Sequence, residues 1–174
     1  MKKLIAATLV TGLAISPIAS FSANAATGNS MDSVKQIEQG DTTLEGATLG
    51  DSIQTVLKEN KNPVYSTSAD GKEHIYEFHK DNGKLVVTTD GKKDKGHITR
   101  VSMSYNDTDG PSYKDVKKQL SDDAVTREHY NSVTGNFGYI QDDRASYQFS
   151  SQSPDDIKHQ TLSNRYWRIV KLKN

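Results

Sequence analysis

A series of short segments with alternating polar and apolar residues, separated by strong turn signals, constrains the fold of this chain most. The clearest turn lies at residues 81–83, where Asn-Gly readily adopts the positive φ angles that a tight hairpin requires. Tyr76 and Phe78 share one face of the segment before this turn. Leu85 and Val87 share one face of the segment after it. Such alternation predicts half-buried β-strands, and short connections favour antiparallel pairing.

A short amphipathic stripe precedes each of two sets of such segments. Apolar residues spaced three and four apart predict one helix near 51–60 and another near 112–121. The predicted strands are 64–68, 73–79, 84–89, 98–105, 124–130, 136–141, 145–150 and 165–172. The sequence therefore predicts an α+β fold, in which two tandem helix-plus-four-strand units form one mainly antiparallel sheet with the helices on one face.

Polar segments mark the expected boundaries of the chain. The run of Asn, Asp, Gly and Pro at 106–111 separates a first unit, 47–106, from a second unit, 107–174. Residues 26–46 are rich in Thr, Gly, Asn and Ser, and they predict a flexible N-terminal arm. A long polar connection at 151–164 is expected before the last strand.

Residues 1–25 have the pattern of an export signal. Lys2 and Lys3 supply the positive start, residues 4–15 are mostly apolar, and the Ala-Asn-Ala at 23–25 suits a signal peptidase. A membrane anchor is the alternative, but the apolar run is shorter than the roughly 20 residues that a span needs. We expect a secreted, extracellular product without a membrane span, in solution or loosely associated with the cell wall.

The composition excludes several classes of protein. Basic and acidic residues both number 22, so no net charge recruits nucleic acid or a membrane surface. Cysteine is absent, which excludes disulfides, thiol nucleophiles and iron–sulfur clusters. Only 33% of the residues are hydrophobic, so the core is modest.

No motif predicts an enzyme, a cofactor or a metal site. The acidic run near Gly110 resembles a calcium loop only in its centre, because Tyr105 and Val116 occupy the end positions where ligands are needed. The five histidines show no metal-binding pair at helical spacing. The Gly-x-Ser-x-Gly elbow of serine hydrolases is absent. We therefore expect no catalytic, cofactor-binding or metal-binding residue.

The aromatic residues suggest a binding surface. Eight tyrosines and one tryptophan outnumber four phenylalanines, and tyrosine suits surfaces that are partly exposed. Trp167, Tyr166, Tyr139 and Tyr130 are the least constrained to be buried, so we expect them on the open face of the sheet as contacts for an unknown protein partner. Trp167 and Tyr166 are adjacent on a predicted strand, so only one can face outward. Packing against loops or the N-terminal arm is the alternative for these side chains.

Two lysine-rich segments, 92–95 and 114–118, support an alternative function. Basic clusters near aromatic residues can hold a polyanion, which would make the chain a cell-wall-associated or polyanion-associated structural factor. The acids interleaved with these lysines favour solvated loops instead. We expect a non-enzymatic, monomeric module that binds a protein.

The run from Thr48 to Pro63, which contains Leu-Gly-Asp-Ser-Ile and ends in Asn-Pro, is similar to the opening of a known α/β unit. Single units of this kind occur in small bacterial outer-membrane assembly lipoproteins, and tandem ones in the β-lactamase-inhibitor-protein architecture. The N-terminal Lys-Lys-Leu-Ile-Ala-Ala segment also resembles uncharacterised secreted staphylococcal proteins. The resemblance covers about residues 47–172. It implies an antiparallel sheet backed by two helices and does not imply inhibition of a β-lactamase.

Overall fold

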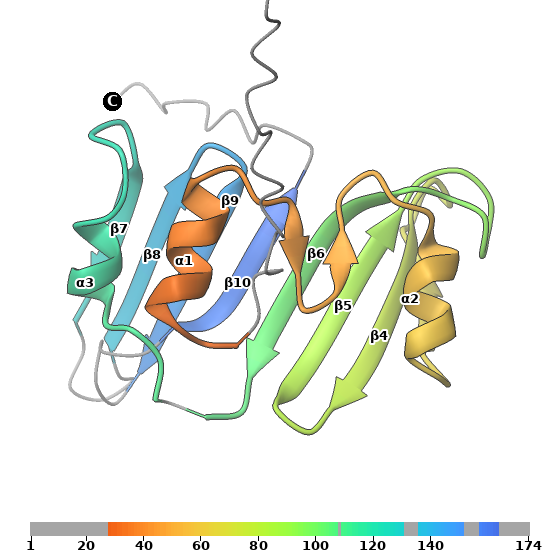
Figure 1. Ribbon diagram of the computed structural model, residues 1–174, viewed down its shortest axis with the longest axis horizontal. Helices are drawn as coiled ribbons and strands as arrows, with labels where there is room; N and C mark the ends of the chain where they lie inside the picture. The colour runs from red at the N-terminus through yellow and green to blue at the C-terminus, as the bar shows by residue number, and fades with distance from the viewer. Residues whose placement is uncertain (1–27, 108, 131–135, 152–156, 164–174) are drawn as a thin grey trace, which may run out of the picture.

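A computed structural model describes residues 28–107, 109–130, 136–151 and 157–163 (Figure 1). Within these residues, eight strands form a large sheet in the order β3-β4-β5-β6-β10-β9-β8-β7, and every neighbouring pair is antiparallel. Along the chain, the first four strands of this sheet are β3 (Val64–Thr67), β4 (His74–Lys80), β5 (Gly83–Thr89) and β6 (Ile98–Tyr105). The last four are β7 (Val125–His129), β8 (Asn136–Asp142), β9 (Ala145–Ser151) and β10 (Ile157–Ser163). The mixed, mostly antiparallel fold is confirmed.

A second, separate sheet corrects the expectation of a single one. It consists of β1 (Thr43–Leu44) and β2 (Ala47–Thr48). Contacts between side chains hold this hairpin over the large sheet: Leu44 is fully buried, and the hydroxyl of Tyr105 donates a 3.2 Å hydrogen bond to Glu45 Oε1 in the hairpin turn. The hairpin therefore covers part of the core instead of extending the ladder of the large sheet.

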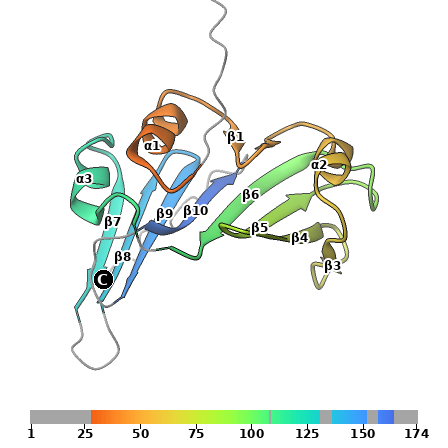
Figure 2. The same ribbon diagram turned by 60° about the horizontal axis from the view of Figure 1, so that its bottom comes forward.

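Three helices of the described part of the chain contribute to the core. These are α1 (Met31–Glu38), α2 (Ile53–Glu59) and α3 (Tyr113–Lys117). The last two lie within the predicted helical ranges, and Ser52 and Ser112 cap them by accepting backbone N–H hydrogen bonds. Their buried residues belong to the same hydrophobic cluster as the alternating residues of the large sheet. Figure 2 shows α1 and α3 over the part of the sheet that β7 to β10 form.

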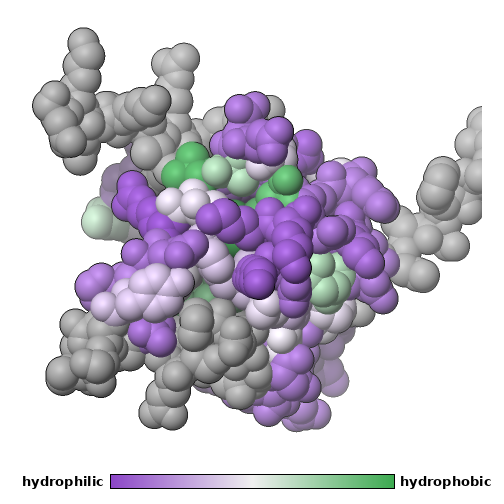
Figure 3. Space-filling model, turned by 90° about the vertical axis from the view of Figure 1, so that its left-hand side faces the viewer, coloured by the Kyte–Doolittle hydropathy of each residue, from purple (hydrophilic) through white to green (hydrophobic). Residues whose placement is uncertain are grey.

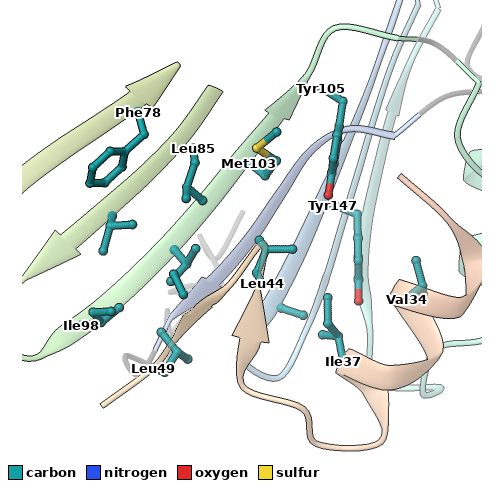
Figure 4. Packing of buried hydrophobic residues seen from close by; sticks show 14 of the residues in the cluster. Val34, Ile37, Leu44, Leu49, Phe78, Leu85, Ile98, Met103, Tyr105 and Tyr147 are labelled. Atoms are coloured by element: carbon teal, nitrogen blue, oxygen red, sulfur yellow. The ribbon is translucent and has the colours of Figure 1, made fainter. Parts of the chain in front are cut away.

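Helix α1 and the β1–β2 hairpin show that the expected flexible arm at 26–46 was wrong for most of that segment. Val34 and Ile37 are buried, on the side of α1 that faces Tyr147 (Figure 4). A short apolar stripe of this kind gains its stability from the surface on which it packs and not from its own helix propensity. The stripe was visible in the sequence, but that surface was not.

Strand β10 corrects the end of the predicted fold. Its residues, Ile157–Ser163, lie inside the segment that was expected to be a polar connection. β10 lies between β6 and β9 and pairs with both, so its backbone forms hydrogen-bonded ladders on two sides. This explains how a polar segment becomes a central strand. The predicted strand at 165–172 lies outside the described residues.

Candidate functional site

The large sheet has an inner face, which packs on the helices, and an outer face, whose side chains alternate with the buried ones. We call this second surface the outer face. The alternation along each strand and the register between strands determine which residues lie on it. They are Val64, Ser66, Ile75, Glu77, His79, Lys84, Val86, Thr88, Arg100, Ser102, Ser104, Val125, Arg127, His129, Phe137, Tyr139, Gln141, Ser146 and Gln148.

Tyr139, one of the residues expected to contact a partner, lies on the outer face. It is half-buried between two inward-facing neighbours in β8, Gly138 and Ile140. Its hydroxyl donates a 2.8 Å hydrogen bond to Gln141 Oε1. Burial raises the pKa of the Tyr139 hydroxyl, and the positive charge of Arg127 opposes that rise. The ring is therefore held in place beside a cation.

Exposed apolar side chains surround Tyr139. Phe137 is two residues earlier in β8 and is 40% exposed, and Val125 in β7 is 39% exposed. The register places Arg127 opposite Tyr139 and His129 opposite Phe137. We call Val125, Arg127, Phe137 and Tyr139 the β7–β8 patch. It combines rings, an aliphatic side chain and a cation, which is the composition that protein interfaces favour.

Tyr130 does not join this patch. It follows β7, is 63% exposed, and donates a 2.9 Å hydrogen bond to Glu128 Oε2. Glu128 pairs in register with the inward-facing Gly138 and also meets Lys117 of α3 at 3.5 Å. Tyr130 therefore belongs to the α3 side of β7. That end of the molecule is mostly hydrophilic, with small hydrophobic patches (Figure 3).

Two of the four predicted contact residues, Trp167 and Tyr166, lie outside the described residues. Sequence reasoning missed Phe137, although its two-residue spacing from Tyr139 indicated that the two rings share a face. It also missed Arg127, for which no sequence signal existed, because only the pairing of β7 with β8 places it beside Tyr139.

The lysine-rich loop at 90–97 has a defined structure. The backbone N–H of Asp94 donates a 2.7 Å hydrogen bond to the Tyr76 hydroxyl. Lys93 Nζ lies 4.3 Å from the centroid of the Tyr65 ring, which is a cation–π contact. Lys92 and Lys95 remain exposed. In the second lysine-rich segment, Lys118 pairs with Asp115 at 3.2 Å. The loop at 90–97 is thus ordered, and it exposes Lys92 and Lys95 to solvent.

The described residues contain no group of three or more His, Asp and Glu side chains suited to hold a metal ion. Over the same part of the chain, no helix is long and apolar enough to cross a membrane.

The comparisons with known proteins give one finding. No curated protein and no solved structure matches the chain. A family model described as SA0570-like matches residues 1–163, which is most of the sequence and includes every described strand. This match confirms the expected resemblance to an uncharacterised staphylococcal family. The expected likeness to the β-lactamase-inhibitor-protein architecture is not confirmed. The chain belongs to the SA0570-like family.

Proposed function

We propose that this chain is a secreted, non-enzymatic binding module that binds another protein through the outer face of its large sheet. Residues 1–25 serve as its export signal, and the remainder forms two tandem helix-plus-four-strand units with a likeness to the β-lactamase-inhibitor-protein architecture. The order of elements supports the two units, because α2 precedes β3 to β6 and α3 precedes β7 to β10.

The observation that carries this proposal is the β7–β8 patch. Large side chains lie at the surface there. Tyr139 is held by its hydrogen bond to Gln141, and Phe137 belongs to a strand that is paired with β7 on one side and β9 on the other. Rings that are already ordered lose little conformational entropy when a partner covers them. Truncating such a residue at the centre of an interface typically costs about 2 kcal/mol or more of binding free energy.

The second candidate function is binding of a cell-wall polymer or another polyanion through the lysine-rich loop. This function is favoured by the exposed Lys92 and Lys95, which lie in a loop that the hydrogen bond between Asp94 and Tyr76 fixes. Binding of a polyanion should fall steeply with rising salt, because each neutralised charge releases a counterion. A contact centred on Tyr139 should depend much less on salt.

The experiment is capture of partners from culture medium and host serum by the immobilised full-length chain, followed by mass spectrometry. Tyr139→Ala is compared with Tyr130→Ala, which removes the same side chain from a more exposed position on the α3 side of β7. We expect a protein that the wild type and Tyr130→Ala retain and that Tyr139→Ala loses. Equal capture by both variants would refute the outer-face site. Loss only in Lys92→Ala/Lys95→Ala would favour the polyanion function.

A further inference from the structure

Charges are distributed unequally between the outer face and the rest of the molecule. Among the described strand positions of the outer face, the cations are Lys84, Arg100 and Arg127, and the only acid is Glu77. On the remaining described residues, acidic side chains outnumber basic ones. A chain with no net charge therefore presents a positive face, which its composition alone conceals.

The single acid of the outer face is already neutralised. Glu77 Oε2 lies 3.5 Å from Lys84 Nζ, and Glu77 Oε1 lies 3.1 Å from His79 Nε2. These three side chains are at the β4–β5 part of the sheet. Lys84 is committed to this group, and Arg100 lies on β6. Among the described positions of the outer face, Arg127 on β7 is the cation in the β9–β8–β7 half of the sheet.

In that half, Arg127 is the cation next to the exposed rings. Its side chain is exposed, it lies opposite Tyr139 in the ladder, and no ion pair found among the described residues includes it. Its charge reaches the Tyr139 hydroxyl. His129, also exposed, lies opposite Phe137.

We propose that the β7–β8 patch receives an acidic protein surface, with a partner carboxylate paired to Arg127 and apolar groups covering Phe137 and Tyr139. This inference rests on the proposed function and specifies the chemistry of the partner. The guanidinium can hold a carboxylate through two parallel hydrogen bonds, which positions the partner as well as attracting it. A polymeric anion fits less well, because neutral Ser, Thr and Gln side chains separate the cations of this face.

The first arm of the test uses defined probes and the full-length chain. The probes are a fluorescent peptide of six Glu-Thr repeats, the matching Gln-Thr peptide, and polyphosphate of equal charge. Fluorescence anisotropy should show binding of the Glu-Thr peptide and not of the Gln-Thr peptide. Arg127→Glu should weaken that binding about 10-fold or more, because it places like charges together. Failure of the acidic peptide to bind, or tighter binding of polyphosphate, would overturn the proposal.

The matched control is Arg144→Glu, which reverses an exposed arginine in the β8–β9 turn, where it pairs with Asp143 at 3.4 Å. It should bind the Glu-Thr peptide like the wild type, whereas an equal loss in both variants would indicate a general charge effect and refute the site. Thermal unfolding checks that each variant is folded.

The second arm separates this inference from the function on which it rests. It uses any protein captured by the wild type. If Tyr139→Ala loses that protein and Arg127→Glu keeps it, the acidic-partner inference fails and the outer-face function stands. If both variants keep it, both proposals fail. Loss in both variants supports both.

Discussion

Raising the pH through neutrality should loosen α1 from the sheet, because its last residue, Glu38, is half-buried. Glu38 Oε1 accepts a 2.7 Å hydrogen bond from the Tyr147 hydroxyl. Burial raises the pKa of Glu38 to about 7; the Tyr147 hydrogen bond lowers it, and the negative charges of Asp142 and Asp143 raise it further. Lys35, one turn earlier on α1, pairs with Asp32 at 3.8 Å.

The sign follows from proton linkage. Glu38 has a higher pKa in the folded chain than in the unfolded one, so its contribution to stability is complete below about pH 4.5 and is lost as the pH rises through about 7. A shift from 4.5 to about 7 corresponds to about 3 kcal/mol at 1.36 kcal/mol per unit. Solvent reaches part of this carboxyl, and screening reduces the expected loss to about 1–2 kcal/mol.

The assay is urea unfolding of the wild type and of Glu38→Gln at pH 5 and pH 8. The glutamine cannot ionise, so the variant should lack the part of the pH dependence that Glu38 contributes. The difference in unfolding free energy between the wild type and the variant should therefore change by about 1–2 kcal/mol across this range. Glu59→Gln is the matched control, because Glu59 is the last residue of α2 and is exposed. An identical pH dependence in Glu38→Gln and wild type would refute the reasoning.

Two further predictions concern packing. A Cβ atom at Gly138 would lie 2.7 Å from Cδ2 of the Tyr113 ring, so Gly138→Ala should displace α3 and cost about 1–3 kcal/mol of unfolding free energy; an unchanged urea midpoint would contradict this contact. Ile53 is fully buried in α2, so Ile53→Ala should cost about 2–5 kcal/mol. Leu57→Ala, at a partly buried position of the same helix, should cost less, and the reverse order in thermal or urea unfolding would show that α2 packs differently.

The sequence alone identified much of the local structure. Tyr76 and Phe78 alternate with polar neighbours over a segment of the right length, and Asn82-Gly83 supplies a tight turn, so β4 and β5 could be predicted as a hairpin. The stripe that includes Ile53 and Val56 likewise predicted α2. These signals depend only on residues close together in the chain, which is why a pattern can report them.

Residues distant in the chain decided the rest. β10 is a strand because β6 and β9 pair with it, although its own residues resemble a polar connection. α1 is ordered because Val34 and Ile37 are buried against the rest of the core. The large sheet on which α1 packs lies outside 26–46, so no pattern within that segment could predict this packing.

For the candidate site, too, the sequence predicted some features and the tertiary structure determined the others. Sequence reasoning selected Tyr139 from its residue type and its place in a predicted strand. It could not separate Tyr139 from Tyr130, because the face on which each residue lies depends on where β7 ends and how it pairs with β8. It could not place Arg127 beside Tyr139 either, since cross-strand neighbours are set by register. Residue types are a property of the chain, whereas the neighbours that make them a surface arise only when the sheet has formed.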